Sequence, residues 1–287
     1  MAFDSIEELL QETQQKPLWK VILEDDLHTQ GISYEESWNK MQYLWDAMKS
    51  ASQNYQGELT SVSGLIGGDG AKMQHLADTQ QTIGGDFLAD IITQALKMGE
   101  SNACMKRIVA APTAGSCGVL PAVLIPFCKK FQTSDDEIIK ALYVSAGFGQ
   151  IIALRASISG AEGGCQAEIG SASAMAAAAL VSLKGGSPTM AAHACAMALK
   201  SLMGLVCDPV AGLVEIPCVK RNVVGAVNAV SCADMALAGI TSAIPPDEVI
   251  DAMQSVGLSM PIALKETGKG GLAATPTGQR IAKKMKK

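Results

Sequence analysis

Three cysteines in the second half of the chain have the sequence surroundings of metal ligands. Cys165, Cys207 and Cys218 occur in the segments GGCQ, VCDP and IPCV, so each lies close to glycine or proline. Thiolates held on irregular backbone suit a soft metal ion or an iron–sulfur cluster. Three protein ligands would leave one metal position open for chemistry. The pattern alone leaves a second interpretation open, in which the three are buried cysteines near turns.

The spacing of the other cysteines argues against other kinds of cysteine chemistry. A structural zinc site usually contains closely spaced cysteine pairs, and the eight cysteines of this chain include none. The redox motif Cys-x-x-Cys is absent for the same reason. Helical or apolar surroundings predict buried small side chains at Cys104, Cys128, Cys195 and Cys232. The context of Cys117 is ambiguous.

A glycine-rich segment at residues 61–72, SVSGLIGGDGAK, is a candidate anion-binding loop. It lacks the third glycine of a dinucleotide fingerprint and the Gly-Lys-Ser/Thr ending of a P-loop. Two interpretations stay open. The segment is either a turn before a helix that starts near Ala71, or a set of backbone amides at a helix N-terminus that receives a carboxylate.

A second loop, at residues 109–118, contains the sequence GSCG, which superficially resembles a nucleophile motif. It does not match G-x-S-x-G, and no strand pattern precedes it, as a nucleophile elbow would require. We therefore expect a small-residue turn near a bound ligand.

The composition favours closely packed helices. Hydrophobic residues make up 48% of the 287 residues but aromatic residues only 4%, so the apolar mass is aliphatic. The net charge of −5 and the lack of a basic stripe argue against nucleic acid as a partner. Charged residues are only 18% of the chain, which suggests that a partner covers part of the surface.

The N-terminal residues lack the pattern of an export signal, and the many unpaired cysteines fit a reducing compartment, so we expect a cytoplasmic protein. The uncharged segment 108–128 contains three prolines and two glycines between positions 112 and 126. A continuous membrane-spanning helix is therefore not expected there, and we predict no membrane partner.

Apolar periodicity and capping residues predict a mostly all-α helical bundle. The segment SAMAAAALVSL, which closes at Gly185, is alanine on all sides and should form the central helix of the bundle. Loops around it would carry the cysteines. Residues 1–60 are expected to form an N-terminal helical segment and residues 61–287 the catalytic α-helical domain, the two forming one continuous unit. Further helices are expected at 4–15, 33–55, 84–98, 134–147, 187–204 and 222–241.

Six motifs in order give the chain a family resemblance. They are SGLIGGDGAK, APTAGSCGVLP, SISGAEGGCQAEIGSAS, GLVCDPVAGLVEIPCVKRN, ADMALAGI and ETGKGGLAATPTG. The chain resembles the α chain of the iron–sulfur-dependent L-serine dehydratases (L-serine ammonia-lyases) nearly end to end. The resemblance implies a [4Fe–4S] cluster held by Cys165, Cys207 and Cys218, whose fourth iron binds L-serine. It also implies a separate β chain that completes the enzyme.

The expected activity is β-elimination of water from L-serine, which gives pyruvate and ammonia with the open iron as Lewis acid. Lys72 and His75 are the candidate catalytic residues, although Lys72 suits carboxylate binding better unless burial lowers its pKa. The resemblance implies an alternative base, a histidine of the β chain. Carboxylate binding is expected from Ser63, Gly67 and Gly68 and from the turn containing Thr113 and Gly115, with Thr267 and Gly268 closing the site.

Two other functions share part of this pattern. An L-cysteine desulfidase would use the same kind of cluster but release sulfide. A non-catalytic iron–sulfur sensor or electron carrier would normally saturate its cluster with four cysteines. A pyridoxal-phosphate serine dehydratase would need a Schiff-base lysine and an α/β fold, and the sequence indicates neither.

Overall fold

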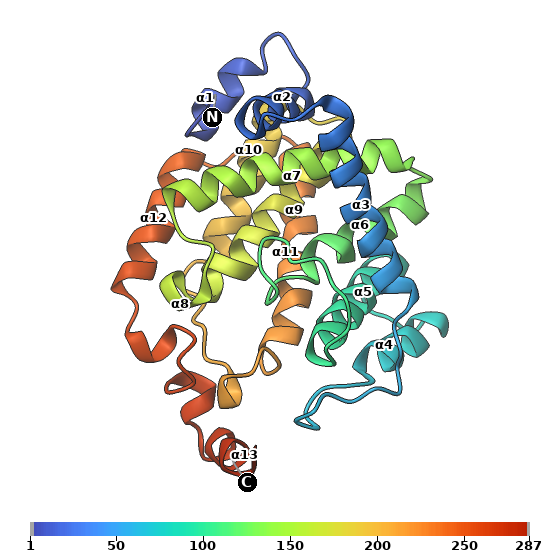
Figure 1. Cartoon of the computed structure of the whole chain (residues 1–287), viewed down its shortest axis with the longest axis vertical. Helices are drawn as coiled ribbons and strands as arrows, with labels where there is room; N and C mark the ends of the chain where they lie inside the picture. Colours follow the sequence, from blue (N-terminus) through green and yellow to red (C-terminus); the bar gives the residue numbers. More distant parts are fainter. Residues whose placement is uncertain (1–2, 286–287) are drawn as a thin grey trace.

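The computed structural model describes residues 3–285, and these residues are mostly helical (Figure 1). The only extended pairing among them is an isolated bridge between Cys207 and Lys265. The predicted all-α class is therefore confirmed. The α-helices are α1 (Ile6–Glu12), α2 (Leu18–Gln30), α3 (Tyr34–Gln53), α4 (Asp69–Asp78), α5 (Gly85–Ala103), α6 (Val119–Phe131), α7 (Asp135–Arg155), α8 (Gly160–Gly163), α9 (Ser171–Leu183), α10 (Pro188–Ser201), α11 (Cys218–Leu237), α12 (Pro246–Ser259) and α13 (Pro276–Met285).

Four short helical turns complete the chain. They are the π-helical turn η1 (Gln166–Gly170) and the 3-10 turns η2 (Val210–Gly212), η3 (Ile262–Leu264) and η4 (Gly271–Ala274). All four lie next to cysteine-bearing segments or in the C-terminal region that packs against them. Irregular backbone is therefore concentrated around the predicted site.

The alanine-rich helix α9 is the centre of the bundle, as predicted. Every residue from Ser171 to Val181 is buried. Helices α6, α7, α10 and α11 pack around it, and Figure 1 shows it in the middle of the molecule. The approach is close: a Cβ at Gly149 of α7 would lie 2.8 Å from the Met175 sulfur. Small side chains on all faces of α9 make this contact with several neighbours possible.

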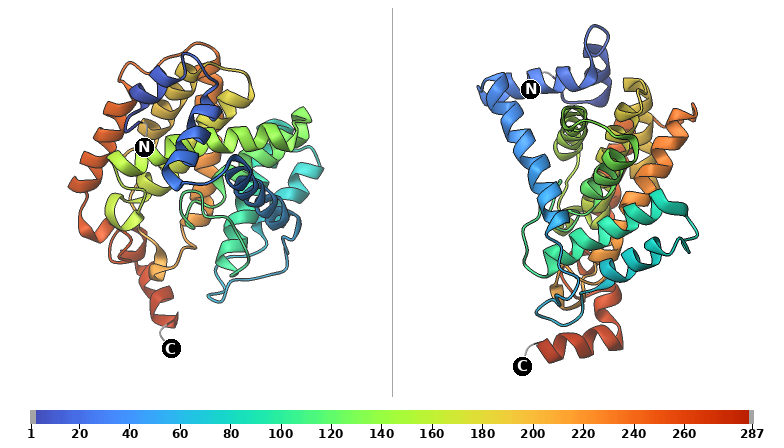
Figure 2. Two further views of the ribbon diagram at one scale, coloured as in Figure 1. Left: turned by 45° about the horizontal axis from the view of Figure 1, so that its top comes forward. Right: turned by 90° about the vertical axis from the view of Figure 1, so that its right-hand side faces the viewer.

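The N-terminal helices lie against the end and side of this bundle (Figure 2). A capping box formed by Ser33 and Glu36 starts α3. Trp45 of α3 is fully buried, and its Nε1 donates to Asp135 Oδ1 at the start of α7, at 2.6 Å. Residues of α1 to α3 belong to the same hydrophobic core as α9. The division at residue 60 stays a prediction.

Several helix boundaries differ from the sequence-based expectation. Helix α2 is not among the predicted helices, and α7 continues to Arg155 instead of ending near Gly147. Gly147 does not end the helix, because it allows close packing: a Cβ there would lie 2.5 Å from Ile22 of α2. Helix α11 begins at Cys218, four residues before the predicted start, so of the pair Cys207 and Cys218 only Cys207 lies in a loop.

One described helix, α7, is long and apolar enough to cross a membrane by length and composition. Two thirds of that stretch (67%) is buried inside the bundle, against α9, α2 and α3. Its hydropathy is therefore that of a core helix. The uncharged segment 108–128 forms an irregular stretch followed by α6, which contains Pro121 in its first turn and Pro126 inside the helix.

Candidate functional site: a three-cysteine centre

Cys165, Cys207 and Cys218 converge from three separate segments. Cys165 lies between α8 and η1, Cys207 forms an isolated parallel bridge with Lys265, and Cys218 opens α11. All three are free and buried. The Sγ atoms of Cys165 and Cys207 lie within 4.8 Å of each other, and the side chains of Cys207 and Cys218 both lower the pKa of Cys165. The structure thus brings together the three residues that the sequence singled out.

The pKa of the Cys165 thiol and the pKa values of its two neighbours are shifted in opposite directions. Hydrogen bonds from Cys207 and Cys218 lower the pKa of Cys165, and the charge of Arg221 lowers it further. The pKa values of Cys207 and Cys218 are raised, because each donates to Cys165 and is buried. Ionising all three thiols together requires a further positive charge, which a bound metal centre supplies.

Arg221 connects Cys165 to the C-terminal region. Its Nη1 donates to Cys165 Sγ at 3.4 Å and to the Val206 carbonyl at 2.7 Å, and its Nη2 donates to Asp208 Oδ1 at 2.8 Å. The second oxygen of Asp208 accepts the Leu272 backbone N–H at 2.8 Å. The Arg221 and Asp208 side chains are only 14% and 5% exposed. One buried ion pair therefore fixes a thiolate, the loop after Cys207 and the segment at η4.

Glu168 is the second polar group beside the cysteines. Its carboxylate and the Sγ atoms of Cys165 and Cys207 all lie within 4.8 Å of one another. Thr113 Oγ1 donates to Glu168 Oε1 at 2.7 Å. Burial raises the pKa of the Glu168 carboxyl to about 7, and the charges of Cys165 and Glu266 add to this rise.

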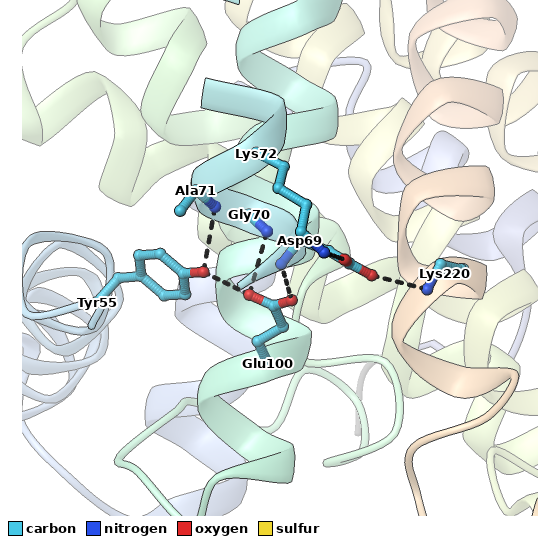
Figure 3. Close-up of polar contacts among 7 residues, drawn as sticks. All are labelled: Tyr55, Asp69, Gly70, Ala71, Lys72, Glu100 and Lys220. Atoms are coloured by element: carbon cyan, nitrogen blue, oxygen red, sulfur yellow. Dashed lines mark hydrogen bonds and ion pairs between the residues drawn. The ribbon is translucent and has the colours of Figure 1, made fainter. Parts of the chain in front are cut away.

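The glycine-rich loop ends in an anion cradle that an internal carboxylate fills (Figure 3). Helix α4 begins at Asp69, two residues before the predicted start near Ala71, and Gly68 offers no side-chain cap. Glu100 of α5, which is 2% exposed, accepts the backbone N–H groups of Asp69 at 2.6 Å and Gly70 at 3.1 Å, and Tyr55 donates its hydroxyl to the same carboxylate. The helix N-terminus therefore receives Glu100.

Two contacts join this loop to the segment that carries Cys207 and Cys218. The Ser63 hydroxyl donates to the Glu215 carboxylate. The Lys220 ammonium, in the first turn of α11, pairs with Asp69 at 2.9 Å. Gly67 has a φ of 150°, and a Cβ there would lie 2.2 Å from the Leu59 carbonyl oxygen. The loop can take this path only with glycine at that position.

Thr113 and Gly115 both lie next to Glu168, which in turn lies beside Cys165 and Cys207. A Cβ at Gly115 would lie 3.0 Å from Glu168 Oε1. The Gly115 carbonyl accepts the Asn222 amide at 2.8 Å, and Asn222 Oδ1 accepts the Gly118 N–H at 2.8 Å. Asn222 of α11 thereby fixes both ends of the small-residue turn.

Thr267 and Gly268 lie on the segment that lines the cysteine loop. Cys207 donates its N–H to the Leu264 carbonyl, and its own carbonyl accepts the N–H of Glu266, both at 2.8 Å. A Cβ at Gly268 would lie 3.3 Å from the Gly212 nitrogen. The Thr267 hydroxyl is bound to the backbone carbonyls of Ile262 and Ala263.

The two candidate catalytic residues are exposed on α4. The Lys72 side chain is 76% exposed and pairs with Asp69 at 2.9 Å. This hydrogen bond raises the pKa of Lys72, so the lowering by burial that a lysine base needs does not occur. His75 is also exposed, in the last turn of α4.

The family is decided by the sequence comparisons. Residues 13–273 match the family model described as serine dehydratase alpha chain. The chain belongs to this family. It is 47% identical over 285 residues to a probable L-serine dehydratase alpha chain of Bacillus subtilis, covering 99% of this chain and 95% of the relative.

Two further relatives agree. The L-serine dehydratase alpha chain of Peptoniphilus asaccharolyticus is 45% identical over 266 residues, which are 92% of this chain and 91% of the relative. L-serine dehydratase TdcG of Escherichia coli is 45% identical over 181 residues, which are 62% of this chain and 40% of the relative. The resemblance carried by the six sequence motifs is therefore confirmed.

The donor set in this member of the family fits an iron–sulfur group. Three buried thiols from separate segments meet at one point without a disulfide, and thiolate is the ligand that such clusters use. In the remaining cysteines burial outweighs any nearby positive charge, so their pKa values are raised. Burial raises the pKa of Cys117 to about 12 and also raises those of Cys104, Cys128, Cys195 and Cys232.

Sequence analysis missed four polar residues of this region: Glu168, Arg221, Asp208 and Glu100. Two of them had a local signal, because Glu168 and Arg221 each follow a candidate ligand by three residues, about one helical turn. Asp208 directly follows Cys207 but lies in a loop, where the spacing of residues does not predict which way a side chain points. Glu100 lies far in sequence from Cys165, Cys207 and Cys218, and no sequence pattern indicated its role.

Proposed function

We propose that this chain is the catalytic α chain of an L-serine ammonia-lyase, which eliminates water from L-serine and yields pyruvate and ammonia. The observation that carries the proposal is the meeting of three buried thiols in a chain of the serine dehydratase α family. The names of the aligned relatives supply the substrate and the reaction.

The proposed cofactor is a [4Fe–4S] cluster with Cys165, Cys207 and Cys218 as its ligands. When bound, such a cluster supplies a Lewis acid at the iron that no cysteine holds, which assists departure of the β-hydroxyl. Arg221 holds one of the sulfurs by a hydrogen bond from its guanidinium. Asp208 in turn holds Arg221 in place.

The chain's own residues are proposed to bind and orient L-serine around this centre. Thr113 and Gly115 are supported by their contact with Glu168, and Gly268 by its contact with the loop between Cys207 and Cys218. Ser63, Gly67, Gly68 and Thr267 complete the proposed substrate-binding set. The amides of Asp69 and Gly70 are not part of it, because Glu100 already occupies them.

Lys72 and His75 are proposed to have different roles, and of the two only His75 is proposed as a proton acceptor. Lys72 stays protonated through its pairing with Asp69, so its proposed role is to attract the substrate carboxylate. A base from a partner chain is the alternative. In either case the proton leaves the α-carbon, the hydroxyl leaves the β-carbon, and the resulting aminoacrylate tautomerises and is hydrolysed to pyruvate and ammonia.

A separate β chain is the proposed partner. The word alpha in the family description and in the relatives' names implies a second kind of chain. Large apolar side chains are exposed on the segments that carry or adjoin the site: Val62 at 96%, Ile262 at 78% and Leu258 at 71%. A covering partner would remove them from water. We also propose the cytoplasm as the compartment, since all eight cysteines are free.

A matched pair of cysteine variants tests the proposal. Cys207→Ala is expected to remove the cluster and the dehydratase activity after anaerobic reconstitution. Cys195→Ala changes an equally buried cysteine of α10 and should keep both. Iron and sulfide content, visible absorbance and pyruvate formation from L-serine are measured, with L-cysteine as a second substrate. Equal loss of cluster and activity in both variants would contradict the ligand assignment. Sulfide release from L-cysteine, without pyruvate formation from L-serine, would identify the enzyme as a desulfidase.

A further inference from the structure

The Glu168 carboxylate occupies a closely defined place beside the cysteine centre. It lies in η1, the π-helical turn that follows Cys165. One oxygen of its carboxylate and the Sγ atoms of Cys165 and Cys207 lie within 4.8 Å of one another. A π-helical turn at this point is notable, because such turns frequently occur at functional sites.

One hydrogen bond and two glycines define the position of this carboxylate. Thr113 donates to Oε1 at 2.7 Å. Two glycines leave the space that the carboxylate fills: a Cβ at Gly160 would lie 2.7 Å from Oε2 and 3.2 Å from the Cys207 sulfur, and a Cβ at Gly115 would lie 3.0 Å from Oε1. A side chain at Gly160 would force the carboxylate to shift, and one at Gly115 would crowd its other oxygen.

One oxygen of Glu168 is left for a ligand. Oε1 accepts the Thr113 hydroxyl, whereas Oε2 accepts no hydrogen bond from residues 3–285. Two other carboxylates on the segment from Cys207 to Cys218 are already engaged, Asp208 by Arg221 and Glu215 by Ser63. Glu266 also acts electrostatically on Glu168, but it belongs to the partly exposed C-terminal region.

We infer that Glu168 binds the ammonium group of the amino-acid substrate. The inference rests on the proposed function, which makes the ligand L-serine. The ammonium nitrogen and the hydroxyl oxygen of L-serine are separated by only two carbon atoms. One molecule can therefore meet the carboxylate with its ammonium group while its hydroxyl is directed at the neighbouring cysteine centre. A charge-assisted hydrogen bond is the strong form of this contact.

Glu168→Gln removes the charge and keeps the size of the side chain. In the reconstituted holoenzyme with its partner, the Kd and KM for L-serine are expected to rise about 10- to 100-fold, the range for losing one hydrogen bond to a charged group. Iron content, sulfide content and visible absorbance should stay at wild-type values. Glu162→Gln, which changes an exposed glutamate of α8, is the matched control and should bind L-serine normally.

A second ligand separates ammonium binding from a general disturbance. The probe is 3-hydroxypropanoate, which is L-serine without its amino group, used as a competitive inhibitor. It is expected to bind wild type and Glu168→Gln equally well. Equal weakening of the probe and of L-serine would overturn the inference.

The remaining outcomes overturn it in distinguishable ways. Loss of iron in Glu168→Gln would make Glu168 a ligand of the metal centre. A large fall in kcat with an unchanged Kd would make it a proton-transfer group. An inactive wild-type enzyme would reject the proposed function itself, whereas an active wild type with unchanged L-serine affinity in Glu168→Gln would reject only this inference.

Discussion

Arg221 shows at the scale of one residue why the cysteine centre is sensitive to its surroundings. Its guanidinium contacts a cysteine sulfur, a backbone carbonyl and a carboxylate at once, in a largely buried position. Only arginine offers a planar fork of donors that can do this, and lysine cannot replace it. The same burial means that removing one partner of the Arg221–Asp208 pair leaves the other uncompensated.

A double-mutant cycle measures this dependence. Arg221→Met alone is expected to lower the free energy of unfolding by about 3 kcal/mol or more, because Asp208 becomes an unpaired buried charge. Adding Asp208→Leu should restore part of this loss, since the second change removes the uncompensated charge. Denaturant unfolding of both single variants and the double variant gives the coupling energy. Strictly additive effects would contradict a direct pairing.

The helix α4 illustrates how an element is placed by a residue far away in sequence. Its N-terminal amides bind Glu100, and its first residue, Asp69, pairs with Lys220 of α11. Burial and the hydrogen bond to Glu100 also raise the pKa of Tyr55, so the tyrosine stays a neutral donor. The Asp69–Lys220 ion pair (Figure 3) and the Ser63–Glu215 hydrogen bond together hold the glycine-rich loop against the segment that carries Cys218.

Replacing this internal anion should loosen the element. Glu100→Gln is expected to lower the free energy of unfolding by about 2 kcal/mol, since it weakens hydrogen bonds to a buried charge. The amides of Asp69 and Gly70 should also exchange with deuterium faster. Glu58→Gln, at an exposed glutamate in the preceding loop, serves as control. Unchanged exchange at both amides in Glu100→Gln would show that the carboxylate does not hold the helix.

The helices that the sequence could predict are those with a strong local pattern. The alanine-rich segment of α9 has no polar face, which already indicates a buried central helix. The extension of α7 could not be predicted in this way. A glycine such as Gly147 is typical of a helix end, and only the tertiary contact with Ile22 shows that it serves close packing.

At the scale of the whole molecule, the site is built from segments that are distant in sequence. The turn containing Thr113, the segment around Cys165, the loop from Cys207 to Cys218 and the C-terminal region all meet at the cysteine centre. In Figure 1 the loop between α10 and α11 and the residues after α12 lie toward the same end of the molecule. The helical bundle supplies the rigid frame.

This construction explains which parts of the site the sequence could indicate. The cysteines were identifiable because each combines a reactive residue type with glycine or proline nearby. The role of Glu168 depends on Thr113 from another loop and on the space left by Gly160 and Gly115. Likewise, the occupant of the glycine-rich loop is Glu100, a fact that only the packing of α4 on α5 reveals. Pairings across the fold carry no local signal.

The central claim is that L-serine binds at a cluster held by only three cysteines. The most direct test is Mössbauer spectroscopy of the anaerobically reconstituted, ⁵⁷Fe-labelled enzyme, with and without L-serine. The account predicts that L-serine changes the signal of one iron of the cluster and leaves the others unaltered. Pyruvate formation from L-serine with no change at any iron would contradict it.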